Sequence, residues 1–126
     1  MVKVVVDTSI LIEEVRQGSP GLRKLAKMAR DGRWKLIIPV TVIGELWAGQ
    51  SMRFKLSRQA MLNKLKGMEI MDIDVNTACK YGEIVRHGGR QGNDTWIAAS
   101  ALVNRAKVAT LNKKDFEKIE GLKLVL

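Results

Sequence analysis

The fold is decided at the N-terminus, by the stretch Val2-Lys3-Val4-Val5-Val6-Asp7-Thr8-Ser9. Four valines in a run of five residues are typical of a strand that is buried on both faces of a parallel sheet. The run stops at Asp7, and Asp7-Thr8-Ser9 predicts a turn or the cap of a following helix. The sequence therefore begins with a buried strand that carries a carboxylate at its end.

Further apolar segments alternate with helical patterns along the rest of the chain. The predicted strands cover 36–38, 68–73, 107–111 and 122–126, and the predicted helices cover 22–29, 41–49, 53–66, 74–86, 93–106 and 113–119. Strands that alternate with helices indicate an α/β sandwich with a five-stranded, mainly parallel sheet. At 126 residues the length suits one domain over 1–126.

The charge is strongly basic and unevenly distributed. The chain has 22 lysines and arginines against 13 acidic residues, a formal net charge of +9. Residues 21–66 hold eleven of the bases and only two of the acids, so the surplus lies in this tract. Such a density favours a polyanionic partner, either nucleic acid or an acidic membrane surface. A solvated helix face would give the same pattern.

The composition also excludes several kinds of site. The single Cys79 and the single His87 leave no intrachain disulfide, no cysteine-rich zinc site and no histidine-rich metal centre. No phosphate-binding loop, dinucleotide fingerprint or nucleophile elbow occurs. With short apolar runs and no cleavable signal, we expect a cytoplasmic protein with no membrane contact.

Acidic residues stand at or near the carboxyl ends of the predicted strands, where ligands bind in parallel α/β sheets. Each has an ordinary structural explanation. Asp7 and Asp94 suit helix N-termini, and Asp115 suits a capping box that starts at Asn112. Glu45 is harder to explain in this way, because a carboxylate in an apolar helix is costly to bury without a cation.

The topology brings these four acids to one edge of the sheet in a basic protein. Clustered carboxylates raise one another's pKa, so such a cluster normally persists with a cation. Oxygen ligands with almost no histidine or cysteine favour Mg²⁺ or Mn²⁺. Metal-bound carboxylates beside a basic surface are typical of phosphodiester hydrolysis, so the residues predict a nuclease.

The motifs in this order resemble the PIN-domain family, and most closely the VapC-type toxins of toxin–antitoxin modules. The resemblance covers essentially the whole chain. It rests on Val4-Val5-Val6-Asp7-Thr8-Ser9, Gly44-Glu45-Leu46, Asn93-Asp94 with Ile97-Ala98-Ala99, and Ala109-Thr110-Leu111-Asn112 with Asp115-Phe116 and Gly121-Leu122.

This resemblance implies a PIN-like three-layer sandwich and a magnesium-dependent ribonuclease with an acidic pocket. Asp7, Glu45 and Asp94 match the acids that hold the metal, and Thr8, Ser9, Thr110 and Asn112 match the positions that support them. The fourth acid departs from the clearest pattern: Asn112 occupies a position that is Asp in some members, and we assign Asp115 instead. The family relationship further implies an RNA substrate, a VapB-like antitoxin and a homodimer.

The basic helices at 22–35 and 53–66 are expected to guide the RNA backbone, with Arg53, Lys55 and Arg58 as candidates. Arg86 and Arg90 are candidates for contact with the RNA near the pocket. Trp47, Trp96 and Phe54 could stack on bases, but their apolar helical patterns predict core positions. Two other functions stay open, an RNA-processing nuclease of the same fold without an antitoxin and a non-catalytic RNA- or protein-binding domain.

Overall fold

The computed structural model describes residues 1–126 and has five parallel strands between two layers of helices. The strands are β1 (Val2–Val6), β2 (Trp34–Pro39), β3 (Glu69–Met71), β4 (Lys107–Ala109) and β5 (Leu124–Val125), in the order β3-β2-β1-β4-β5. The predicted α/β sandwich is confirmed, and every strand pair is parallel. The outer strands are shorter than predicted, because only their central residues pair.

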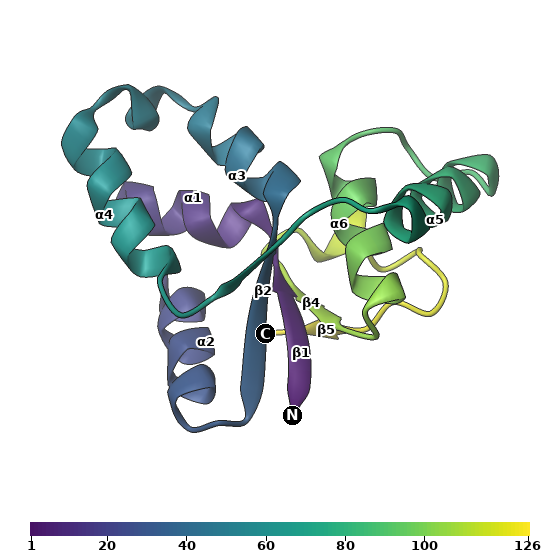
Figure 1. Ribbon diagram of the computed structural model, residues 1–126, viewed down its shortest axis with the longest axis horizontal. Helices are drawn as coiled ribbons and strands as arrows, with labels where there is room; N and C mark the ends of the chain where they lie inside the picture. The colour runs from purple at the N-terminus through teal and green to yellow at the C-terminus, as the bar shows by residue number, and fades with distance from the viewer.

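Helices cover both faces of the sheet (Figure 1). On one side lie α1 (Thr8–Gln17), α2 (Pro20–Arg30), α3 (Val40–Trp47) and α4 (Lys55–Leu65), and on the other lie α5 (Val75–Arg86) and α6 (Asn93–Val103). Two 3-10 turns complete the fold, η1 (Gln50–Arg53) and η2 (Lys113–Asp115). The segment 113–119, predicted as a short helix, therefore forms only this one tight turn.

The valine run lies at the centre of the molecule. Val4, Val5 and Val6 are completely buried, because β1 is the middle strand and helices pack on both of its faces. On one side β1 pairs with β2, with Val5 opposite Ile37, and on the other with β4, with Val6 opposite Ala109. This register brings the residues that follow β1 and β4 to the same edge of the sheet.

A partly shielded ion pair joins α4 to α1. The Glu14 carboxylate accepts a hydrogen bond from the Ser19 backbone N–H at 2.7 Å and forms an ion pair with the Lys64 ammonium at 2.8 Å. The Glu14 side chain is 13% exposed. The hydrogen bond from Lys64 is the main cause that holds the pKa of Glu14 below its usual value.

We predict that Glu14→Gln destabilises the protein by about 1 kcal/mol at pH 7, since it removes a charged acceptor from a partly shielded pair. A lowered pKa stabilises the fold above the unfolded value of 4.5, and this contribution is lost as the pH falls. Urea unfolding at pH 7 and pH 3 measures both effects. Glu13→Gln is the matched control, since Glu13 forms no ion pair. Equal losses for the two variants would contradict the assignment.

Candidate nuclease site

The site starts from Asp7, which follows directly on the central strand. Its side chain is only 2% exposed, and its backbone N–H donates to the Ala109 carbonyl at 2.9 Å, extending the β1–β4 pairing. The carboxylate Oδ2 accepts hydrogen bonds from the Ser9 and Thr110 hydroxyls, each at 2.7 Å. Asp7 caps α1 by position only, since its side chain makes no capping bond. The position of the carboxylate is thus set by the two hydroxyls and not by the helix N-terminus.

Two hydroxyls connect Asp7 to the chain that follows β4. Ser9 Oγ accepts from the Leu111 backbone N–H at 3.1 Å, and Thr110 Oγ1 accepts from the Asn112 N–H at 2.9 Å. The Asn112 side chain itself makes no hydrogen bond, so only its backbone takes part. Ser9 and Thr110 therefore lie where supporting hydroxyls were expected, while Asn112 is an exposed neighbour.

Asn93, to which the sequence alone assigned no separate role, connects both helical layers. Its Nδ2 donates to Glu45 Oε1 at 2.8 Å and lies 3.4 Å from Thr8 Oγ1. Its Oδ1 is buried without a hydrogen-bond partner. Side chains of α1, α3 and α6 thus meet through one amide, which holds the Glu45 carboxylate beside the buried end of β1.

Glu45 corrects the expectation that a carboxylate in the apolar α3 would be buried. The residue is exposed, because the buried side of α3 is formed by Val42 and Leu46 and Glu45 lies beside that side rather than on it. The burial cost invoked for it does not apply. Its position is set instead by the hydrogen bond from Asn93.

Asp94 has the most perturbed carboxyl group of the site. It stands in the first turn of α6 and is half-buried. Burial, followed by the negative charges of Asp7, Asp115 and Glu45, raises the pKa of Asp94 to about 6. The three other predicted acids thus all act electrostatically on Asp94. None of these acids forms an ion pair with a lysine or arginine.

Asp115 lies at the end of η2 and is exposed. The capping box suggested for Asn112 and Asp115 does not form, because no side-chain cap bond is present at η2. The four acids are not gathered around one point, since no three acidic, histidine or cysteine side chains lie close enough together to hold an ion.

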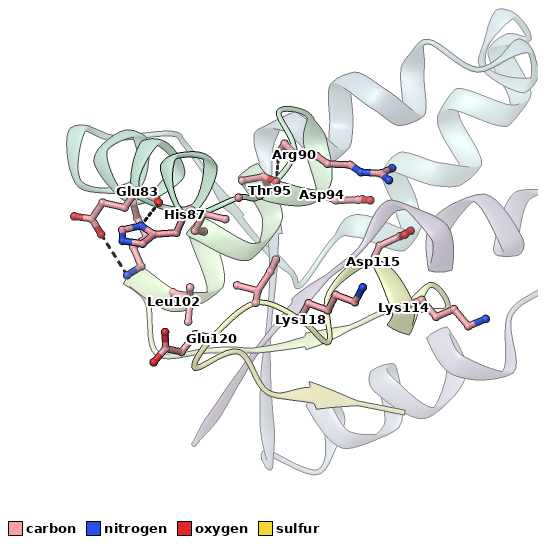
Figure 2. Close-up of a pocket in the computed structure, with 15 residues that line it drawn as sticks. Glu83, His87, Arg90, Asp94, Thr95, Leu102, Lys114, Asp115, Lys118 and Glu120 are labelled. Carbon is pink, nitrogen blue, oxygen red and sulfur yellow. Dashed lines mark hydrogen bonds and ion pairs between the residues drawn. The ribbon is translucent and has the colours of Figure 1, made fainter.

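A cleft of about 900 Å³ opens beside Asp94 and Asp115 (Figure 2). It lies between the C-terminal end of α5, the start of α6 and the chain after β4. Arg90 lines this cleft, whereas Arg86 does not. The acidic site therefore continues into a groove on the α5–α6 side of the molecule.

The other basic candidates are partly engaged elsewhere. Arg58 donates to the Met52 carbonyl at 2.9 Å, and Arg53 lies 4.7 Å above the Phe54 ring. Phe54 corrects a second expectation: it is 55% exposed and not part of the core. Trp47 is half-buried, and Trp96 is half-buried and stacks on Tyr81 with ring centroids 3.9 Å apart.

Comparison with known proteins decides the family. The PIN domain model matches residues 4–122. The chain belongs to the PIN-domain family. A search of curated proteins gave no match. None of the helices has the length and hydropathy needed to cross a lipid bilayer.

Solved structures of VapBC toxin–antitoxin complexes share this fold. VapBC2 from Rickettsia felis, solved with a DNA fragment from its promoter, is 26% identical over 98% of each chain, with a TM-score of 0.79. DNA-bound VapBC from Salmonella typhimurium is 22% identical over 99% of this chain and 98% of its own, with a TM-score of 0.80. VapBC-5 from Mycobacterium tuberculosis is 23% identical, covers 99% and 100% of the two chains, and has a TM-score of 0.64.

We predict that Asp94→Asn stabilises the metal-free protein by about 1–2 kcal/mol at pH 7, after allowance for solvent screening. The raised pKa means that ionisation of Asp94 opposes folding as the pH rises from about 4 to 6. The advantage of the variant should therefore vanish below pH 4. Thermal unfolding with EDTA measures it. The exposed Asp72 supplies the control Asp72→Asn, and an equal gain in that variant would contradict the electrostatic explanation.

Proposed function

We propose that this PIN-domain protein is a metal-dependent endoribonuclease and the toxin component of a VapBC-type module. The observation that carries the proposal is the buried Asp7 at the end of β1, with the charges of Asp94, Glu45 and Asp115 beside it and no basic partner. The similarity to VapBC complexes supports the toxin assignment. The catalytic residues are proposed to be Asp7, Glu45, Asp94 and Asp115.

The donor set fits a hard divalent cation. Every candidate ligand is an oxygen. The pKa of Asp94 is raised by burial and then by the negative charges of Asp7, Asp115 and Glu45, and none of these carboxylates forms an ion pair. Asp7 and Asp94 would hold Mg²⁺ or Mn²⁺, and Glu45 would hold a second ion or orient the water. Such an ion supplies charge neutralisation at the phosphate and lowers the pKa of water.

The residues of the chain then have distinct tasks. Ser9 and Thr110 fix the Asp7 carboxylate, and Asn93 fixes Glu45 next to it. Water attacks the phosphorus in line with the 3′-oxygen. The bond from phosphorus to that oxygen breaks, and a proton passes to it. The products are a 5′-phosphate and a 3′-hydroxyl.

Exposed apolar side chains support the proposed protein partners. Phe54, between η1 and α4, is 55% exposed, and Leu56 and Leu62 on α4 are 79% and 52% exposed, among the bases of the same segment. We propose that a VapB-like antitoxin with an apolar and acidic segment covers them. Val75 at the start of α5 is 77% exposed, and Ile70 on the edge strand β3 is 47% exposed. These residues support a homodimer.

The purified protein should cleave RNA with Mg²⁺ or Mn²⁺ and not with chelator. Asp7→Asn should lower cleavage by at least about 100-fold, because it removes a proposed ligand without changing side-chain volume. Gel assays on structured and single-stranded RNA measure this, with Asp72→Asn as the control. Binding of RNA without cleavage by the wild type would favour a non-catalytic domain, and cleavage retained by Asp7→Asn would contradict the site.

Asn93→Ala should lower kcat about tenfold with little change in KM, since it removes the hydrogen bond that orients Glu45. Asn112→Ala is the matched control, because the Asn112 side chain makes no hydrogen bond. Steady-state kinetics on a short RNA separates the two constants. A rise in KM at constant kcat would instead place Asn93 in substrate binding.

A further inference from the structure

The cleft next to Asp94 is lined by α5 with the loop that follows it, by α6, and by the segment after β4. Figure 2 shows Arg90 and Asp94 on one side and Asp115 and Lys118 on the other, while the side chain of Lys114, on the same segment after β4, extends away from them. Only Ile84, Leu102 and Ile119 contribute apolar side chains. A cleft of this volume, about 900 Å³, has room for a nucleotide-sized ligand.

Three cations in the cleft have no acidic partner. Arg90, Lys114 and Lys118 form no ion pair, although carboxylates line the same cleft. The other lining lysine, Lys80, is paired with Glu83 at 3.4 Å. Unpaired guanidinium and ammonium groups that face a polar cleft are available to a phosphate.

The loop that carries Arg90 is held in place at both ends. The Gly89 backbone N–H donates to the Ile84 carbonyl at 2.9 Å, and a Cβ on Gly89 would lie 2.8 Å from that oxygen. After Arg90, the buried Thr95 hydroxyl donates to the Arg90 carbonyl. The Gly92 N–H donates to the Tyr81 hydroxyl at 3.1 Å. These hydrogen bonds fix the loop in the conformation in which Arg90 lines the cleft.

The residues that line the cleft favour a sugar–phosphate backbone over stacked bases. No aromatic ring except the His87 imidazole lines the cleft, so stacking of bases has little support there. Glu83 and Glu120 lie at the end remote from Asp94 in Figure 2, and they would repel a polyanion that ran past them. The favourable region is the short stretch between Arg90 and Lys118.

We propose that this cleft binds the sugar–phosphate backbone of the RNA strand on one side of the bond that is cleaved, with Arg90 and Lys118 as its phosphate contacts. The inference rests on the proposed ribonuclease function. It also shifts the principal backbone contact from the basic tract 21–66 to the α5–α6 side. In that tract Lys35 and Lys64 are ion-paired, and Arg58 bonds the Met52 carbonyl.

The test compares two double variants by fluorescence anisotropy, with a labelled single-stranded RNA in EDTA so that no cleavage occurs. Arg90→Ala/Lys118→Ala should weaken binding about tenfold and reduce the salt slope by about 1.4, as expected for two single-strand phosphate contacts. Arg53→Ala/Lys55→Ala should change binding less than threefold. Lys24→Ala/Lys27→Ala on α2 serves as a control for net charge, and melting temperatures check the fold.

Length dependence adds a second readout. The RNAs compared are extended either only on the 5′ side or only on the 3′ side of the cleaved bond. The wild type should bind one of these two sets more tightly as the RNA is lengthened. That gain in affinity should disappear in Arg90→Ala/Lys118→Ala. Arg90→Lys should restore most of the loss in Arg90→Ala, since the charge is kept.

Three outcomes would overturn the proposal. One is unchanged RNA affinity in Arg90→Ala/Lys118→Ala; another is an equal loss in the Lys24→Ala/Lys27→Ala control. The third is that Arg90→Ala/Lys118→Ala binds a polyglutamate peptide more weakly than the wild type but binds RNA equally well. That result would assign the cleft to an acidic peptide.

Absence of metal-dependent cleavage by the wild type would refute the ribonuclease function itself. Cleavage by the wild type with unaltered KM in the double variant would refute only the cleft assignment.

Discussion

The parallel pairing of β1 with β4 is the constraint on which the rest of the structure depends. Because Val6 lies opposite Ala109, the next residues, Asp7 and Thr110, emerge side by side from the sheet. A carboxylate as buried as that of Asp7 is tolerated only with strong hydrogen-bond donors, and two hydroxyls supply them at 2.7 Å. The core of valines therefore does more than stabilise the fold, since it fixes the position of one negative charge.

Around this fixed charge, the other acids come from elements that belong to different layers. Glu45 stands on α3, on the same side of the sheet as α1, whereas Asp94 stands on α6 on the opposite side (Figure 1). The Asn93 amide bridges the two layers through Glu45 and Thr8. Since its Oδ1 is buried and unpartnered, the amide is only half satisfied, a condition that proteins rarely keep without a reason. The geometry of the site thus depends on how the layers pack.

The parts of the site that could be predicted from the sequence are those set by strand ends. Asp7 and Thr110 follow buried strands, so the topology alone places them together. The role of Asn93 could not be predicted, because it depends on the distance between α3 and α6, which no local pattern encodes. Phe54 shows the converse: its apolar neighbours predict a core position, yet Met52 on η1 and Met61 on α4 take the buried positions and the Phe54 ring is 55% exposed. Local patterns specify that a helix has an apolar side but not what covers it.

The structure shows that not all of the positive charge behind the net charge of +9 is available to a polyanionic partner. Part of the basic tract 21–66 serves the fold, as the pairs Lys35–Glu69 and Lys64–Glu14 show. The cations next to the acids come instead from the loop before α6 and the segment after β4, two regions with little net charge. These cations line the same cleft as Asp94 and form no ion pair with it. Burial and the neighbouring carboxylates raise the pKa of Asp94. Opposite charges that lie close together without pairing leave each free for a different ligand. In this site the carboxylates remain available to a cation and the bases to the phosphates of the strand that it would act on.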